Sequence, residues 1–184
     1  MKLHFLFFLF YLFSITCLLL ISCENDIKTI QKVSYKPTDP DERTTNIKLI
    51  QTDSGFAKIA LRAKLSETYH KPTTRIKFRE GIEIRLYTKN GKVQSILTAL
   101  YGEIFQETGE MLFKDSVCLK NIQQNQTLQT EELHWNQNTQ AIFTPKNVIV
   151  RSEDGSLFYG DGIKTSLDFK QYEFIKPKGK FKIN

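Results

Sequence analysis

The chain has 184 residues, of which 40% are hydrophobic and 25% charged, and its formal net charge is +6. This length allows one domain with a substantial hydrophobic core and is short for two ordinary domains. The three cysteines are too few to indicate a disulfide framework, so we expect a single domain without a disulfide bridge.

The first residues have the pattern of a targeting segment. Lys2 precedes a long apolar run over residues 5–21, and Leu-Ile-Ser-Cys follows at residues 20–23. These four residues resemble the lipobox of bacterial lipoproteins, in which a peptidase cuts before the cysteine and the thiol carries a diacylglycerol. We therefore expect a signal peptide over residues 1–22 and an acylated Cys23. The alternative is an uncleaved transmembrane helix, since about 20 apolar residues can span a bilayer.

The next segment, residues 23–45, has the composition of a linker. It is polar, contains Pro37 and Pro40, and shows no apolar periodicity. We expect it to connect the anchor to a folded domain over residues 46–184.

From residue 46 onward the pattern predicts β-hairpins. Turn signals occur at residues 53–55, 90–91, 125 and 154–155, spaced by about 30 to 36 residues, which indicates an internal repeat. The strand before each turn carries branched apolar residues two positions apart, such as Ile82 and Ile84. We expect no helix in this region. Two sheets packed face to face, or a partly open roll, would bury these apolar faces.

One strand, at residues 127–135, shows a change of parity. Leu128 and Thr130 share one face of an extended strand, whereas Leu133 and Trp135 have the opposite parity. The inward face must therefore switch near residues 131–132, which predicts a bulge or a sharp bend.

The sequence offers little support for catalysis. His4, His70 and His134 are scattered without metal-binding spacing, and the neighbouring carboxylates at 131–132 and 153–154 do not suit a general acid and base across a cleft. We expect no cofactor and no metal, and a binding or scaffolding protein in place of an enzyme. Residues 164–184 are rich in lysine, but an exported chain is not expected to bind nucleic acid.

An ordered series of segments resembles a known family. The series is TDSG at 52–55, GIEIRLYTKNGKVQSILTA at 81–99, TLQTEELHW at 127–135, FYGDGIKTS at 158–166 and FKQYEFIKPKGKF at 169–181. It is similar to LptC, the periplasmic lipopolysaccharide (LPS) export protein associated with an ABC transporter, in the lipoprotein-like version of Bacteroidetes-type bacteria. The resemblance covers about residues 46–182.

The resemblance implies an OstA/LptA-like β-jellyroll built of antiparallel hairpins, with two sheets around an apolar groove. Such a protein is non-enzymatic, takes LPS from an inner-membrane ABC transporter and passes it to an LptA-like bridge protein in the periplasm. The groove would hold the lipid A acyl chains. Its candidate lining residues, at apolar alternating positions, are Ile84, Leu86, Leu119, Leu133, Trp135, Ile142, Val148 and Val150. The sequence does not separate groove lining from sealed core, and for any one of these residues taken alone we favour the core.

The resemblance also implies two edge strands that pair with partners. Residues 46–52 would face the transporter, and the C-terminal edge would pair with the bridge protein. The candidate residues of that edge are Leu167, Phe169, Tyr172 and Phe174. Pro177 is expected to end its usable length near residue 175.

The anchor departs from the familiar family pattern. Proteobacterial members keep a transmembrane helix that contacts the transporter, whereas cleavage before Cys23 would remove it. We expect a periplasmic protein anchored to the inner membrane by lipid. The alternative function is a lipid-anchored β-sandwich that binds a surface glycan or another protein.

Overall fold

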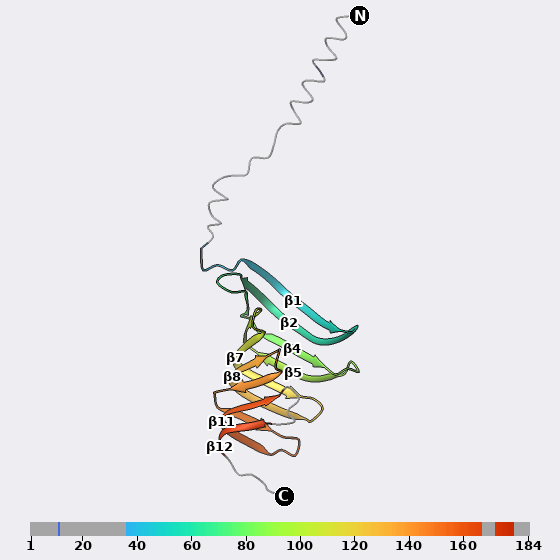
Figure 1. The fold of residues 1–184 in the computed structure, drawn as a ribbon, viewed down its shortest axis with the longest axis vertical. Coiled ribbons are helices and arrows are strands. Elements are labelled where there is room, and N and C mark those ends of the chain that lie inside the picture. Colours follow the sequence, from blue (N-terminus) through green and yellow to red (C-terminus); the bar gives the residue numbers. More distant parts are fainter. Residues whose placement is uncertain (1–10, 12–35, 167–171, 179–184) are drawn as a thin grey trace, which may run out of the picture. The chain divides into compact units, whose positions relative to one another are not determined.

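The computed structural model describes residue 11 and residues 36–166 and 172–178 (Figure 1). The chain divides into two compact units, residues 1–39 and residues 40–184, which we describe separately. In the first unit, Asp39 N donates to Lys36 O at 2.8 Å and Lys36 N donates to Asp39 Oδ2 at 2.9 Å, which forms a turn. Cys23 and the expected signal peptide, apart from Tyr11, lie outside the described residues. Within the described ranges, no helix is long and apolar enough to cross a membrane.

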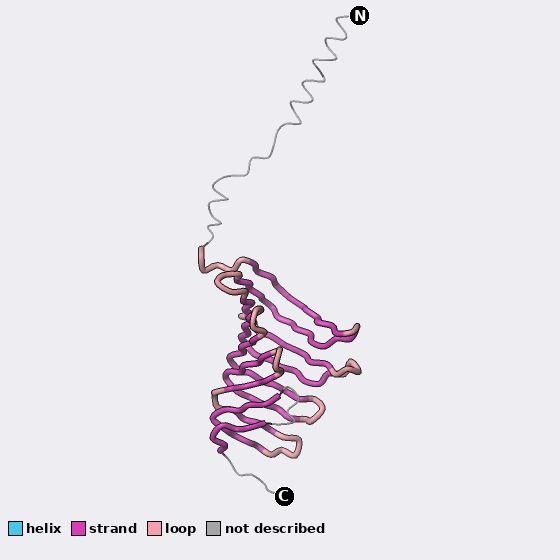
Figure 2. Tube along the Cα trace, viewed as in Figure 1, coloured by secondary structure: helices cyan, strands magenta, loops and turns pink. Residues whose placement is uncertain are grey.

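The described part of the second unit consists of antiparallel strands joined by turns (Figure 2). The strands are β1 (Glu42–Asp53), β2 (Phe56–Tyr69), β3 (Arg75–Phe78), β4 (Ile82–Tyr87), β5 (Val93–Ala99), β6 (Tyr101–Phe105), β7 (Glu110–Asn121), β8 (Gln126–Asn136), β9 (Ala141–Thr144), β10 (Val148–Arg151), β11 (Leu157–Ser166) and β12 (Tyr172–Lys178). The fold is an all-β jellyroll of antiparallel hairpins, which confirms the predicted fold class.

All four predicted hairpin turns are present. They join β1 to β2, β4 to β5, β7 to β8 and β10 to β11. Gly55, Gly91, Asn125 and Gly155 have positive φ, the conformation that tight turns favour and that glycine and asparagine tolerate. β1 begins at Glu42, so it includes residues 42–45, which we expected in the linker. These residues are exposed on both faces and therefore carry no alternating pattern.

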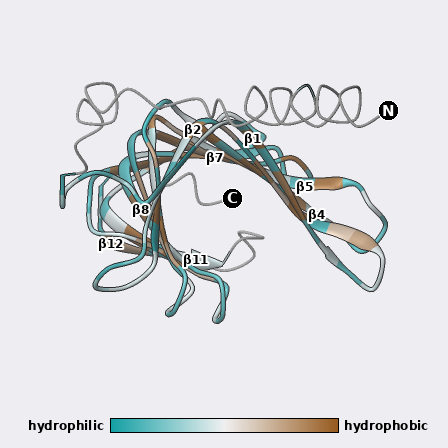
Figure 3. Ribbon diagram, turned by 90° about the horizontal axis from the view of Figure 1, so that it is seen from above, coloured by the Kyte–Doolittle hydropathy of each residue, from teal (hydrophilic) through white to brown (hydrophobic). Residues whose placement is uncertain are grey.

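The described strands form one continuous hydrogen-bonded sheet, and its long strands run through two halves that pack against each other. β2 pairs with β4 along residues 59–63 and with β3 along residues 66–69. The other long strands are divided in the same manner. One end of β7 pairs with β5 and the other end with β6. In β8 and in β11, one end pairs with β10 and the other end with β9. We call the half that contains β4, β5 and β10 the first sheet, and the half that contains β3, β6 and β9 the second sheet. Figure 3 shows the strands curving through β2 and β7 into these two arms.

The bend between the sheets explains the change of parity in β8. Leu128, Thr130, Leu133 and Trp135 are all buried, as the sequence predicts. The register shift that accompanies the change lies in the partner strand, at residues 115–116 of β7, which have φ values of 63° and 55°. Aspartate and serine stand at these positions, and aspartate is one of the few residues other than glycine that visits the left-handed region. The structure therefore confirms the predicted bulge and assigns its extra residue to β7.

The hydrophobic core lies between the two sheets. In the first sheet, cross-strand partners form a buried row that includes Ile84, Leu97 and Leu119. In the second sheet, Trp135 pairs with Ile142 on one side and Met111 on the other. Both rows face inward, so each long strand contributes to both halves of one continuous core.

Candidate functional site

The predicted groove residues all lie in this interior. The eight residues are between 0% and 7% exposed and belong to one core cluster: Ile84, Leu86, Leu119, Leu133, Trp135, Ile142, Val148 and Val150. The sequence predicted their inward position from apolar residues at every second place, because every second residue of a strand faces the same side. Trp135 Nε1 is a buried donor without a hydrogen-bond partner among the described residues.

A cavity of about 1000 Å³ lies between the free ends of the two sheets. Ile59 and Leu86 line it from the first sheet, so the cavity reaches the edge of the core. The rest of its lining is largely polar and comes from both sheets. The polar side chains are Lys58, Tyr87, Gln94, Gln106, Glu107, Gln137, Asn138, Gln140 and Ser166. We call this cavity the mouth of the jellyroll.

Carboxamide side chains dominate the rim of the mouth. Gln137 Nε2 donates to Gln51 Oε1 at 3.1 Å, which joins the turn after β8 to the end of β1. Asn138 Nδ2 donates to Thr108 O at 3.0 Å. Gly109 has a φ of +67°, and a Cβ there would lie 2.9 Å from Asn138 Nδ2, so the close approach of these two turns requires glycine.

Sequence reasoning missed the mouth, because its residues come from six separate segments. The dense run of amides at residues 136–140 was the available signal. A carboxamide is both a donor and an acceptor, so the rim can bind hydroxyl groups without carrying a charge.

The N-terminal edge strand is exposed along its length except at Ile47, which packs against the core. Among the described strands β1 pairs only with β2, and Leu49 and Ile50 are 50% and 53% exposed. Phe56, in the adjoining hairpin, is also exposed. This edge offers unpaired backbone groups beside apolar side chains, which suits the addition of a strand from a partner.

Within the described ranges, the C-terminal edge strand β12 pairs only with β11. Of the predicted edge residues, Tyr172 and Phe174 belong to β12, whereas Leu167 and Phe169 lie outside the described residues. Phe174 is half-buried, and its ring stacks on Phe158 with centroids 6.4 Å apart. Tyr172 meets Phe174 edge to face at 5.6 Å.

β12 extends further than the proline suggested. It continues through Pro177, the register partner of Gly160, to Lys178, whereas we expected the usable edge to end near residue 175. A proline is tolerated in an edge strand because its missing N–H costs no ladder bond when the nitrogen faces solvent.

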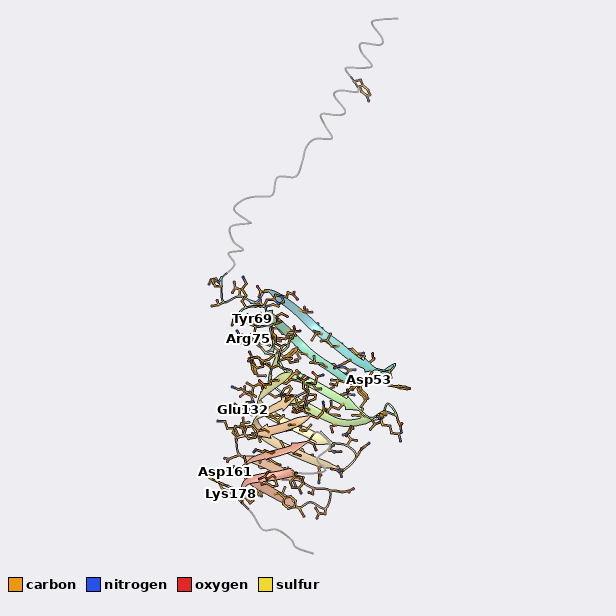
Figure 4. The ribbon with its side chains drawn as sticks, viewed as in Figure 1. Asp53, Tyr69, Arg75, Glu132, Asp161 and Lys178 are labelled. Atoms are coloured by element: carbon orange, nitrogen blue, oxygen red, sulfur yellow. The ribbon has the colours of Figure 1, made fainter. Side chains whose placement is uncertain are left out.

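Two buried carboxylates lie on the outer side of the second sheet. Glu67 is 4% exposed and accepts hydrogen bonds from Arg79 Nε at 2.5 Å and Arg43 Nη2 at 2.8 Å. Burial raises the pKa of Glu67, but the bonds from Arg79 and Arg43 outweigh burial and hold this pKa below its usual range. Tyr69 also donates to Glu67, at 3.3 Å. Figure 4 labels Tyr69 and, near it, Arg75 of the same face.

The second carboxylate, Glu103, accepts a hydrogen bond from Tyr101 Oη at 2.9 Å. Burial and this bond raise the pKa of Tyr101 to about 12. Arg75 and Lys77 approach Glu103 at 3.8 and 4.0 Å. Both carboxylates are thus surrounded by cations and hydroxyl groups, which suits a structural role.

The neighbouring carboxylates considered for catalysis do not form an acid and base pair across a cleft. Glu131 is exposed and lines a small cavity beside Gln129 and Thr130, where it is the one carboxylate among the described residues of the lining. Glu132 lies 2.9 Å from His134 Nε2 and 3.6 Å from Lys114 Nζ. Asp154 accepts hydrogen bonds from Ser156 within a turn. Among the described residues, no cluster of three or more His, Cys, Asp or Glu could hold a metal ion.

Comparisons with known proteins add one finding to this geometry. A family model described as "LptC: Lipopolysaccharide-assembly, LptC-related" matches residues 8–177, which is most of the chain. No curated protein sequence matched the chain.

Proposed function

Because the chain belongs to the LptC family of lipopolysaccharide-assembly proteins, we propose that it receives LPS from an inner-membrane ABC transporter and passes it to the next jellyroll of a periplasmic bridge. The family takes part in LPS transport, is periplasmic and associated with the inner membrane, and acts without catalysis. The observation that supports the proposal is the apolar interior between two sheets, which opens at a polar mouth and ends at an edge strand on either side.

The acyl chains of LPS would enter the interior, and its saccharide would remain at the mouth. Ile59 and Leu86 stand where the cavity meets the core, so acyl chains entering from the mouth would contact them first. The carboxamides of the rim would bind sugar hydroxyls through single neutral hydrogen bonds, each worth about 0.5–1.5 kcal/mol. Bonds of this strength exchange readily, as a carrier that must release its cargo requires.

Deeper in the interior, Trp135 offers a specific contact. Its unpartnered indole N–H could donate to an ester carbonyl or a hydroxyl group of an acyl chain. The sealed packing around it must separate to admit that chain.

The N-terminal segment would anchor the domain. We propose that residues 1–22 are a signal peptide, that Cys23 is acylated and that the residues before β1 form a linker. Two acyl chains hold a protein stably on a bilayer. The domain would then stay at the inner membrane without a helix of its own.

The edge strands would carry the partner contacts. A photoreactive residue in place of Tyr172 is expected to capture the periplasmic jellyroll bridge protein, and one in place of Ile50 the periplasmic part of the transporter, each identified by mass spectrometry. Ile122, which is exposed in a turn, is the matched control position. Capture of the bridge protein from Ile122 as often as from Tyr172 would contradict the assignment.

Depletion in the host bacterium tests the function itself. Newly made LPS is expected to accumulate at the inner membrane when the protein is depleted. The carboxamide rim would also suit a module that binds a surface glycan. Such a module predicts normal LPS export after depletion, so that result would favour the alternative.

A further inference from the structure

The outer face of the first sheet carries two cross-strand rows of side chains, which are exposed or half-buried apart from Ala60. The strand register aligns Ile50, Ala60, Arg85, Ile96, Lys120, Thr127, Arg151 and Leu157 in one row. It aligns Lys48, Arg62, Glu83, Thr98, Cys118, Gln129, Ile149, Tyr159 and Lys178 in the next. Together the rows contain six cations and one carboxylate, and we call them the basic face.

Most cations of the basic face have no internal counterion. Arg85 Nε donates a hydrogen bond to Glu83 Oε1 at 2.7 Å, so Glu83 already has a cationic partner. Lys178 forms an ion pair with Asp161, and both residues are labelled in Figure 4. The other four have no carboxylate partner among the described residues: Lys48, Arg62, Lys120 and Arg151. The outer side of the second sheet differs, because Glu67, Glu103 and Glu132 each lie beside two or more cationic or hydroxyl groups.

One pair on the basic face opposes folding. Lys48 and Arg62 are direct partners across β1 and β2, and both are exposed. Like charges directly opposite each other destabilise a sheet. Among the described strands Lys48 has no neighbour besides β2. The carboxylate nearest in its row, Glu83, lies opposite Arg62 and is bonded to Arg85. The arrangement is explained if an anion outside the domain binds these cations.

The extent of the face indicates what kind of anion this is. Arg85, Lys120 and Arg151 stand on every second strand, and neighbouring strands are about 4.8 Å apart, so these cations are spaced by about 10 Å. A row across eight strands is too wide for one small ligand. Ile50, Ile149 and Tyr159 lie among the cations and are 53%, 38% and 38% exposed. Cations interspersed with apolar and aromatic side chains are typical of surfaces that bind the headgroup region of a bilayer.

We propose that the basic face of the first sheet binds the anionic surface of the membrane. The lysines and arginines contact lipid phosphates, and the exposed apolar side chains reach the boundary of the acyl region. The family is associated with the inner membrane, so this surface lies within reach. The contact holds the domain beside the bilayer when it is not docked on the transporter, and it does not depend on LPS carriage.

Photo-crosslinking of the full-length protein in vesicles tests the proposal. A lipid anchor by itself would bring every face of the domain near the bilayer. The photoreactive residue must therefore show which face contacts the lipid. We place a photoreactive phenylalanine analogue at Gln129, within the basic face, or at Lys164, which is exposed on the second sheet. Vesicles consist of phosphatidylcholine alone or of an equal mixture with phosphatidylglycerol.

In the mixed vesicles, the probe at position 129 is expected to form a phospholipid adduct in good yield. The yield should be several-fold lower in vesicles of phosphatidylcholine alone, and it should be low from position 164 in either kind of vesicle. Combining Lys120→Gln with Arg151→Gln should lower the yield about 25-fold, since each cation near an anionic surface strengthens binding about fivefold. High salt should have the same effect.

Lys48→Glu separates binding from stability. It replaces the like-charge pair with an attractive one, so the thermal midpoint should rise while the lipid adduct from position 129 decreases. Equal adduct yields from the two positions, or a yield that is insensitive to phosphatidylglycerol or to these substitutions, would overturn the proposal. Failure here would leave LPS capture from the interior unaffected.

Discussion

Replacement of Trp135 by alanine is expected to lower the free energy of unfolding by about 3–5 kcal/mol, the usual cost of removing a large aromatic side chain from a core. Trp135 is 1% exposed and packs in the second sheet between Met111 and Ile142. Domains of this size are stable by about 5–15 kcal/mol, so the variant would lose a large part of its stability. Equilibrium unfolding in urea measures the change.

Two control variants separate packing from other effects. Trp135→Phe keeps an aromatic ring and removes the unpartnered indole N–H, so it should cost much less than Trp135→Ala. Ile122→Ala changes an exposed residue and should stay within about 0.5 kcal/mol of the wild type. If Trp135→Ala were as stable as Ile122→Ala, Trp135 would not belong to a sealed core.

Glu67→Gln is expected to lower the free energy of unfolding by about 1–3 kcal/mol at pH 7, because it removes the charged acceptor that Arg43 and Arg79 share. The effect should depend on pH. The folded protein holds the pKa of Glu67 below its usual range, so the carboxylate contributes stability above the unfolded value of about 4.3. That contribution is lost as the pH falls through the lower, folded pKa.

Urea unfolding at pH 7 and at successively lower pH tests this second prediction. The difference between wild type and Glu67→Gln should be largest at neutral pH and should shrink below about pH 4. Glu110→Gln is the matched control, because Glu110 is exposed and makes no ion pair among the described residues. A difference that stays constant between pH 7 and pH 3 would show that the charge of Glu67 does not stabilise the fold.

Local chemistry predicted most of the fold. The turn residues located all four hairpins, because positive φ at Gly91 or Asn125 is a property of the residue and its neighbours. Alternation located the eight interior residues for the same reason. The change of parity in β8 predicted the bend, although the register shows that the extra residue lies in β7.

The features that depend on distant segments could not be predicted. The mouth brings together turns of both sheets, and the Gln51 to Gln137 bond joins residues 86 positions apart. The basic face emerges only from the strand register, because its cations are far apart in the sequence. The start of β1 at Glu42 was missed, since a strand exposed on both faces has no apolar period.

The central claim is that the space between the sheets carries the acyl chains of LPS. Photo-crosslinking in living cells tests it most directly, with the photoreactive residue at Leu86 or Ile59, where the mouth meets the core, and at Lys164, exposed on the second sheet, as the control. The account predicts that LPS is captured from the two inner positions and not from position 164. Capture from no inner position, or equal capture from position 164, would contradict it.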